Sequence, residues 1–510
     1  MIFSKRKDKH MSEQSNKKGT MAKDTVIYMV AKGVEGVVGI LTLSIMTQLF
    51  LPEKMGQYSN VNIAVTTVAM FAIQWLVQSV LRYINKYDIA NEQEKFFTTV
   101  FTAWLKVNII VVFFGVIALI VINSGIFDDT AFSAFLSVYT PEVMFFALLM
   151  FISYNTAQLM ISMLAAVRKA KTNLFISVFS VIGKIALIYV LATNFGKKIE
   201  WIFLSYALFD GITSVIGIFS LKIYKYINVK KSSPEILRDL KAYGIPLMGN
   251  LIATSVLNKS DIYIITGFKG EAQAGIYQTN YSIIASAFTL LSAAVMRGSY
   301  PTILKTWSEG KKELSANLIS EAVRMFLLIS IPAVFGVFCV SETAAKVLFE
   351  SKYVEGHSIM VWVAAGMMLL GLTEYCIKPW ELNAKTKSIF YRSLIGGIVN
   401  IAVNLIFVPM FGYYAAAVST FIGFLVYFAL AYIGTRKLMK WNLPFFVYLR
   451  IILSASVMGA VIMAIRFFMG DGIFSFCLML GAGILTYGAT LFFTGEIKQE
   501  VKGILNALKK

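Results

Sequence analysis

Residues 98–122 read TTVFTAWLKVNIIVVFFGVIALIVI, and runs of this kind decide the fold. The run is almost wholly apolar, and Lys106 is its one charged side chain. A helix needs about 20 consecutive apolar residues to cross the ~30 Å hydrocarbon core of a bilayer. A strand of a membrane barrel would alternate apolar and polar residues, whereas this run is continuous. The stretch therefore predicts a transmembrane helix.

Runs of this length recur along the whole chain. Of its 510 residues, 57% are hydrophobic and 15% are charged, against about 25% charged residues in a typical soluble domain. So few charges cannot cover a globular surface. We therefore expect an all-α membrane protein with about fourteen transmembrane helices. The expected spans are 25–51, 60–81, 98–122, 143–167, 173–194, 200–221, 245–268, 272–296, 325–341, 357–377, 388–408, 412–433, 446–468 and 473–494.

Lysine and arginine residues gather in every second connection between the expected helices. The segments on one side hold 36 of them and those on the other side hold 7. Cytoplasmic loops carry the excess of Lys and Arg in membrane proteins, so we expect both termini in the cytoplasm. The net charge of +19 follows from this pattern. Because the charges form no single stripe along one domain, no nucleic-acid partner is expected.

Three cysteines and two histidines leave little chemistry for a metal or catalytic site. The cysteines lie in apolar runs without pairing or metal-ligand spacing, so we expect no metal and no cofactor. A membrane-embedded glycosyltransferase would need an acidic catalytic cluster and usually a large loop, and no loop exceeds about 30 residues. An enzyme is therefore not expected. The first apolar run is too long for a signal-peptide core and is interpreted as the first helix.

Short matches between the two halves of the chain indicate a weak internal repeat. They are Gly56-Gln57-Tyr58 with Gly275-Ile276-Tyr277, Ala170-Lys171-Thr172 with Ala384-Lys385-Thr386, and Phe195-Gly196 with Phe411-Gly412. Their near-constant offset predicts two six-helix lobes of the same orientation, as in several transporters. The expected organisation is a basic cytoplasmic tail (1–24), a first lobe (25–221), a cytoplasmic linker (222–244), a second lobe (245–433), two extra helices (434–494) and a second basic cytoplasmic tail (495–510).

Charged residues inside the expected helices are candidates for a functional site, because a charge in hydrocarbon is energetically expensive. Lys184 shares one face of its helix with Ser177 and Ser180, and Asp210 lies on a polar face of the next helix. At ~1.5 Å per residue both lie roughly 17 Å from the cytoplasmic end, so we expect them to meet. They form either a structural ion pair or a cationic site in the lumen.

The seventh expected helix carries Asn250, Thr254, Asn258 and Asp261 on one face, and Lys259 points the other way. We expect the Asp261 face to line the translocation cavity. There a carboxylate would repel an anionic group that had come too far, or would carry a proton.

Five more polar residues complete the predicted site. Lys32 and Glu35 lie on the first expected helix, where Lys32 could instead snorkel to the interface. The eleventh expected helix carries Asn400 and Asn404 four residues apart, with Arg392 near its cytoplasmic mouth. The complete set of predicted substrate-binding residues is Lys184, Asp210, Lys32, Glu35, Asp261, Asn250, Asn258, Asn400, Asn404 and Arg392.

Three segments carry a resemblance to a known family. Leu51-Pro52-Glu53-Lys54-Met55-Gly56-Gln57-Tyr58 resembles a conserved turn of polysaccharide-unit flippases, the Wzx type of O-antigen flippase. Ser260-Asp261-Ile262-Tyr263 and Gly275-Ile276-Tyr277 resemble the signature of their helices 7 and 8. Asn400-Ile401-Ala402-Val403-Asn404-Leu405, Pro409-Met410-Phe411-Gly412 and Ala415-Ala416-Ala417 resemble their helix 11–12 segment. These flippases belong to the multidrug/oligosaccharidyl-lipid/polysaccharide exporter superfamily.

The resemblance implies a flippase that moves undecaprenyl-diphosphate-linked oligosaccharide units across the bacterial cytoplasmic (inner) membrane by alternating access. A proton or a sodium ion would be its coupling ion. Its partners would be the lipid-linked substrate, membrane lipids, a polysaccharide polymerase and glycosyltransferases, and a monomer is expected. A lipid II flippase and a multidrug or cation exporter of the same superfamily are the alternatives. The first hairpin of this chain does not match the arginine- and aspartate-rich first hairpin of lipid II flippases. Multidrug and cation exporters usually have twelve helices and an acidic lumen.

Overall fold

The computed structural model describes residues 36, 38–126, 136–167, 169–228, 231–383, 385–441 and 445–497. Within these ranges the regular secondary structure is helical throughout. Twelve segments are long and apolar enough to cross a membrane. They are built on α2 (Pro52–Ile89), α3 (Gln93–Ile122), α5 (Pro141–Ala166), α6 (Ala170–Asn194), α7 (Glu200–Leu221), α9 (Glu271–Ser308), α10 (Lys312–Leu348), α12 (Met360–Cys376), α14 (Thr386–Phe411), α15 (Tyr413–Thr435), α16 (Phe445–Met469) and α17 (Ile473–Phe493). The predicted class, an all-α membrane protein, is confirmed.

The other two expected spans also coincide with helices. A short apolar helix, Val38–Leu49, lies within the first of them. The seventh corresponds to α8 (Pro234–Lys269), which includes charged residues at its start and polar residues in its middle. A helix can still cross a bilayer with polar residues in its middle where they face the protein interior.

Several helices continue well beyond the expected spans. α8 begins at Pro234 and not near 245, and α9 continues to Ser308. The physical reason is that hydropathy marks the hydrocarbon core, whereas a helix can extend past it into water. Short helices fill the connections: η1 (Ile223–Lys225), α11 (Ser351–Val354), η3 (Glu355–Ile359) and α13 (Lys378–Leu382).

The chain forms two compact units, and their boundaries fall inside the short helix Val38–Leu49, inside α2 and inside α8. Unit 1 contains the residues up to Thr42 and Val61–Leu251, and unit 2 contains Leu43–Asn60 and the residues from Ile252 onward. The first turns of α2 therefore pack in unit 2, although the rest of that helix belongs to unit 1. The predicted lobes are intervals of the chain derived from the repeat, and they stay a prediction.

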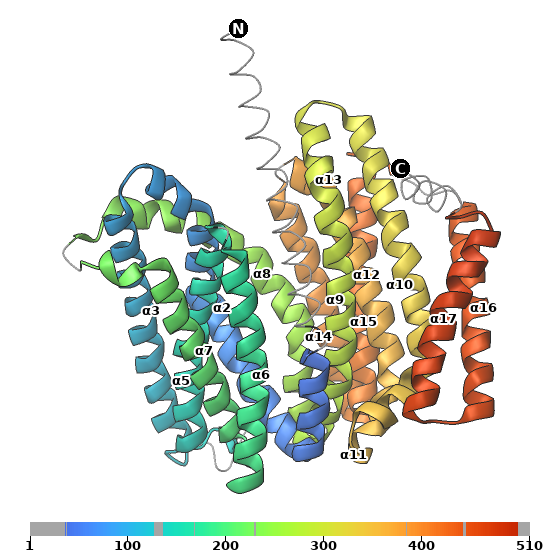
Figure 1. Ribbon diagram of the computed structural model, residues 1–510, viewed down its shortest axis with the longest axis horizontal. Coiled ribbons are helices and arrows are strands. Elements are labelled where there is room, and N and C mark those ends of the chain that lie inside the picture. Colours follow the sequence, from blue (N-terminus) through green and yellow to red (C-terminus); the bar gives the residue numbers. More distant parts are fainter. Residues whose placement is uncertain are drawn as a thin grey trace. The chain divides into compact units, whose positions relative to one another are not determined.

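Helices at equivalent positions of the internal repeat pack against equivalent neighbours in the two units. In unit 1, α7 packs mainly against α5 and α6 (Figure 1). In unit 2, α15 packs mainly against α14 and α12. Close approach relies on glycine in both units: a Cβ at Gly217 of α7 would contact Met160, and one at Gly423 of α15 would contact Asn400. This similar packing in the two units is what an internal repeat would produce.

Glycine also explains the motif at the start of α2. The first turns of α2 cross the start of α9 within unit 2, where a Cβ on Gly56 would overlap the carbonyl group of Glu271. A Cβ on Gly275 would likewise overlap the carbonyl of Pro52. Just beyond the crossing, Asn60 donates from its amide nitrogen to the hydroxyl of Thr266 at 2.9 Å. The matching Gly-x-Tyr segments of the two halves thus lie at one tight crossing.

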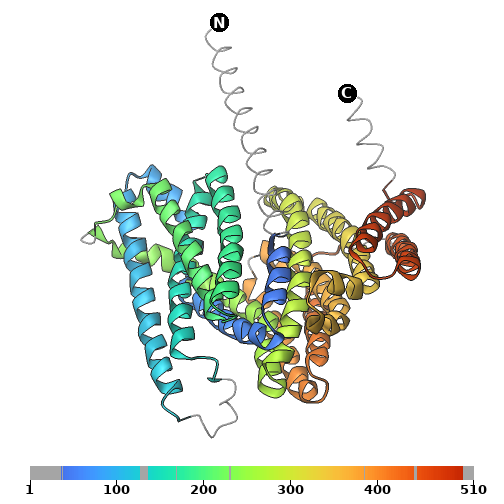
Figure 2. The same cartoon turned by 60° about the horizontal axis from the view of Figure 1, so that its bottom comes forward.

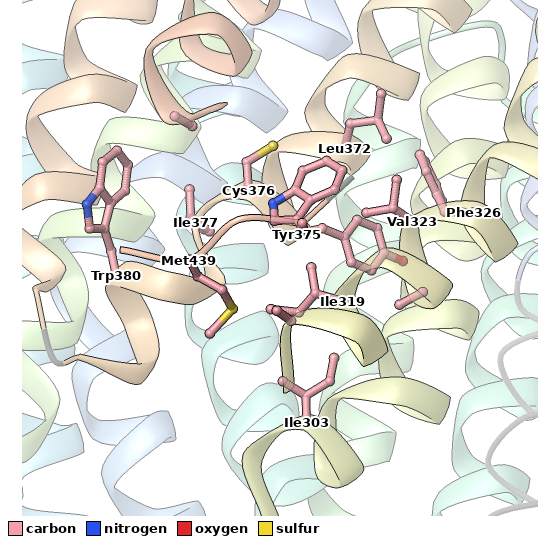
Figure 3. Packing of buried hydrophobic residues seen from close by; sticks show 14 of the residues in the cluster. Ile303, Ile319, Val323, Phe326, Leu372, Tyr375, Cys376, Ile377, Trp380 and Met439 are labelled. Carbon is pink, nitrogen blue, oxygen red and sulfur yellow. The ribbon is translucent and has the colours of Figure 1, made fainter. Parts of the chain in front are cut away.

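An apolar cluster and two groups of charged residues hold unit 2 together. Figure 3 shows the cluster, in which Phe326, Tyr375 and Trp380 are fully or almost fully buried. At one end of the α16–α17 hairpin, Glu496 accepts from Arg324 of α10 at 2.7 Å. At the other end Lys346 pairs with Asp471 at 2.6 Å. The hydrogen bond from Lys346 is the main cause that lowers the pKa of Asp471 to about 2. The Asp471 carboxylate is therefore ionised at physiological pH, and its ion pair with Lys346 is maintained.

Candidate functional site

An ion pair between α6 and α7 lies in the interior of unit 1. The ammonium of Lys184 is 2.6 Å from a carboxylate oxygen of Asp210, and the two side chains are 15% and 8% exposed. The structure thus brings together the two residues whose equal depth led us to expect a contact. α6 and α7 are consecutive and antiparallel, so residues at equal distance from one membrane face come level with each other.

The surroundings of this pair leave both partners with unused bonding capacity. The ammonium lies 4.6 Å from the centre of the Tyr206 ring, in the geometry of a cation–π contact. An ammonium has three N–H donors, and Asp210 accepts one of them. The second carboxylate oxygen of Asp210 is buried and has no hydrogen-bond partner among the described residues. The pair can therefore hold a further polar group without breaking the contact between Lys184 and Asp210.

A second polar centre lies in unit 2 around Asp261, which is 1% exposed. One carboxylate oxygen accepts from the Tyr277 hydroxyl at 2.7 Å and from the Thr420 hydroxyl. The other accepts from the Asn404 amide at 2.6 Å. Four helices meet at this carboxylate, because Asp261 lies on α8, Tyr277 on α9, Asn404 on α14 and Thr420 on α15.

Asn400 completes what we call the Asp261 cluster: Asp261, Tyr277, Asn400, Asn404 and Thr420. The Asn400 side-chain oxygen accepts from Asn404 at 3.3 Å and from the Ser260 hydroxyl at 3.1 Å. All five side chains are buried. The side-chain oxygen of Asn404 has no hydrogen-bond partner among the described residues.

Among the described residues, the groups that hydrogen-bond to the Asp261 carboxylate are all neutral. Each described hydrogen-bond donor to its carboxylate is a hydroxyl or an amide. A buried carboxylate is stable when it is neutralised by a proton or placed beside a cation. The cluster also offers the side-chain oxygen of Asn404, which has no hydrogen-bond partner among the described residues and is a hard oxygen ligand. Chemically, it can take up and release one small cation.

The comparison with known families concerns the first part of the chain. A family model described as "Polysaccharide biosynthesis protein" matches residues 21–307, which is more than half of the chain. The chain belongs to this family. The matched region contains both the Lys184–Asp210 pair and Asp261, whereas Asn400, Asn404 and Thr420 lie beyond it.

Relatives of this family member are remote in sequence. The probable low-salt glycan biosynthesis flippase Agl15 of Haloferax volcanii is 23% identical over 39% of this chain, and the match spans only 42% of Agl15. The probable flippase AglR of the same organism is 23% identical, with 64% of this chain and 68% of AglR covered. Among solved structures, the lipid II flippase MurJ has a TM-score of 0.70 at 16% identity. That match covers 94% of this chain and all of MurJ, and it establishes the fold.

Arg392 is the one further predicted site residue whose side chain the structure describes, and it joins neither centre. Arg392 of α14 lies over the Trp380 ring at 4.2 Å and donates to the Ser388 carbonyl at 3.0 Å. Lys32 and Glu35 lie outside the described residues. The α8 backbone is described at Asn250 and Asn258, but their side chains lie outside the described part of the structure.

Two members of the Asp261 cluster were missed by the sequence analysis as site residues. Tyr277 stands in the Gly275-Ile276-Tyr277 segment, which we used to detect the repeat and the family resemblance. Thr420 is one of the hydroxyl residues in the apolar run of α15, a weak signal because Thr and Ser often bond to their own helix backbone. Thr420 does this as well, at 3.0 Å from the Ala416 carbonyl.

Proposed function

We propose that this protein is a flippase for a polyprenyl-diphosphate-linked oligosaccharide, with undecaprenyl diphosphate as the lipid carrier, and that it works by alternating access in a bacterial cytoplasmic membrane. Membership of a polysaccharide biosynthesis family supports the substrate class. The flippase names of the two Haloferax relatives support the activity. A polysaccharide polymerase and glycosyltransferases would be its partners in the cell, and the protein would act as a monomer.

The observation that carries this proposal is the Lys184–Asp210 pair. Its buried ammonium is a binding group for the diphosphate, because hydrogen bonds between a cation and a phosphate oxygen are strong where water is excluded. Asp210 holds the ammonium in position while the site is empty. When the diphosphate arrives, the free N–H donors of Lys184 bind it, and Asp210 limits how tightly it is held.

The Asp261 cluster is proposed as the site of the coupling cation, a proton or a sodium ion. The sequence predicts that Asp261 lines the translocation cavity, where its carboxylate would repel the diphosphate or carry a coupling proton. Its burial and its neutral donors favour cation binding within unit 2. Binding and release of a cation would change the charge of this site by one unit in each transport cycle.

Transport by the purified protein tests the function. We expect the full chain, reconstituted in vesicles, to move a labelled undecaprenyl-diphosphate oligosaccharide between leaflets, as measured by its accessibility to an added glycosidase. A cell that lacks the gene should accumulate the same lipid-linked unit and lose its surface glycan. Export of a cationic dye without movement of the oligosaccharide would instead favour a multidrug exporter.

The proposed orientation places both termini and residues 222–244 in the cytoplasm, because these segments are basic. Single cysteines at Asp128 and Ser233 should then react from opposite sides of intact cells. The experiment uses a chain with Cys477→Ser, since Cys477 is an exposed native cysteine. We expect an impermeant thiol reagent to label Asp128→Cys in whole cells and Ser233→Cys after lysis only. Labelling of both in whole cells would contradict the topology.

A further inference from the structure

Two polar atoms of α7, one helical turn apart, are buried without a hydrogen-bond partner among the described residues. They are the second carboxylate oxygen of Asp210 and the hydroxyl of Thr213, on side chains that are 6% and 2% exposed. Residues three apart are neighbours on a helix surface, so these two lie on adjacent parts of one face. The next residue, Ser214, instead donates to a carbonyl of its own helix, that of Asp210, at 2.7 Å. A buried polar atom without a partner is energetically costly, so this face is suited to a polar ligand.

α5 supplies further polar and aromatic side chains beside the ion pair. α7 packs against both α5 and α6, and these three helices, coloured teal to green, run alongside one another in both views (Figures 1 and 2). Tyr154 of α5 interacts electrostatically with Asp210, and its hydroxyl is hydrogen-bonded to the side chain of Gln158. Tyr154 and Gln158 are both partly exposed. On the other side, the Tyr206 ring lies 4.6 Å from the ammonium of Lys184. The ion pair is thus accompanied by two aromatic rings and a carboxamide.

These groups together suit a ligand rich in hydroxyl groups. A carboxylate oxygen can only accept a hydrogen bond, whereas a threonine hydroxyl can also donate one. A sugar hydroxyl does both, so it can donate to Asp210 and accept from Thr213. The carboxamide of Gln158 likewise offers a donor and an acceptor. The tyrosine rings add apolar surface for the C–H face of a pyranose ring.

The parts of the proposed substrate differ in what they can offer Asp210. A polyprenyl tail has no polar hydrogen, and an ionised diphosphate only accepts hydrogen bonds. The sugars carry hydroxyl donors, so they alone can satisfy the unpaired carboxylate oxygen. The first sugar is bonded directly to the diphosphate. A diphosphate bound by Lys184 therefore brings this sugar next to Asp210, which is 2.6 Å from the ammonium.

We propose that Asp210, Thr213 and Gln158 form a subsite for the first sugar of the lipid-linked unit. This inference rests on the proposed function, which supplies the diphosphate at Lys184 to which the sugar is attached. The unpaired atoms of Asp210 and Thr213 are covered in this conformation, so the sugar enters where the partly exposed side chains of Lys184 and Gln158 move aside. The subsite would select substrates by the hydroxyl pattern of their first sugar.

Binding of two lipids separates the sugar contact from the diphosphate contact. The probes are undecaprenyl diphosphate with and without one N-acetylglucosamine, each titrated into the full chain in nanodiscs. Thr213→Val removes the hydroxyl and nearly keeps the shape of the side chain. We expect it to raise the Kd of the glycosylated lipid about tenfold, the scale of one buried hydrogen bond, and to leave the Kd of the bare lipid unchanged. Gln158→Leu should show the same selectivity, whereas Lys184→Ala should weaken binding of both lipids.

The matched control is Thr156→Val, which makes the same change on α5 at a hydroxyl that already donates to the Ile152 carbonyl at 2.7 Å. It should change neither Kd. Equal weakening of both lipids by Thr213→Val would overturn the proposal, because the hydroxyl would then serve folding alone. No change for either lipid would also overturn it and would assign the place to buried water. If the wild type moves no oligosaccharide in vesicles but Thr213→Val still weakens only the glycosylated lipid, the subsite stands and the proposed function fails.

Discussion

Replacement of Asp261 by alanine is expected to lower oligosaccharide transport by about 100-fold or more, with normal insertion into the membrane. The carboxylate accepts from Tyr277, Asn404 and Thr420. Its removal leaves these buried donors without their shared acceptor, which costs about 1–3 kcal/mol of folding stability each. It also removes the negative charge that binds the coupling cation. Loss of the coupling cation is expected to raise the transport barrier by about 2.7 kcal/mol, which corresponds to a hundredfold change in rate.

The conservative variant Asp261→Asn separates the charge from the packing, because it keeps the shape of the side chain. A role in cation binding predicts that transport already fails in Asp261→Asn, or loses its dependence on the ion gradient. A packing role predicts near-normal transport. The matched control is Asp239→Asn on the same helix, whose carboxylate pairs with Lys86 at 3.2 Å in a partly exposed position. Exposed pairs of this kind contribute about 0–1 kcal/mol, so the control should transport normally.

Thermal unfolding in detergent identifies the cation. A ligand present at 100 times its Kd stabilises the folded state by about 2.7 kcal/mol. If the cation is sodium, Na⁺ should raise the unfolding temperature of the wild type, and K⁺ at the same ionic strength should not. Asp261→Asn should lose this response. No effect of Na⁺, together with transport that follows the pH gradient, would identify the proton. An unchanged response to the ion in Asp261→Asn would remove the cluster from the coupling mechanism.

Loss of the Lys184 charge is expected to have the second largest effect. Lys184→Ala should reduce transport about 10- to 100-fold, because it removes the proposed diphosphate ligand and leaves the Asp210 carboxylate without its cation. Breaking a buried ion pair on one side is strongly destabilising, at roughly 3–5 kcal/mol. Membrane insertion is therefore measured alongside transport. The control is Lys197→Ala, which removes an exposed lysine just beyond the end of α6.

The double variant Lys184→Ala/Asp210→Ala distinguishes the two roles that the sequence left open. A structural pair predicts that the double variant recovers export, because the unpaired carboxylate is gone. A diphosphate ligand predicts that export stays low even when the protein level returns to normal. Lys184→Arg adds a geometric test, since a guanidinium keeps the charge with a different donor arrangement. Full activity of Lys184→Arg would show that charge is sufficient.

The amino-acid sequence alone determined the helical membrane fold and placed the twelve apolar spans found among the described residues. Hydrocarbon requires every backbone N–H and C=O group to bond within the segment, so continuous apolar runs of this length form helices. It also predicted the contact between Lys184 and Asp210, because both residues lie in one short hairpin. Equal depth on adjacent antiparallel helices nearly determines that contact. The side of the membrane on which each loop lies remains a prediction from charge.

The tertiary structure decided which residues surround Asp261. Helical periodicity shows which face of α8 is polar, but it contains no information about which helices pack on that face. Tyr277, Asn404 and Thr420 come from three other helices, and the last two are more than 140 residues away in sequence. The sequence pattern also did not predict how α2 packs. Its first turns join unit 2 at the close approach of Gly56 and Gly275. Such contacts depend on the shapes of two helix surfaces at once, and one stretch of sequence describes only one of the two.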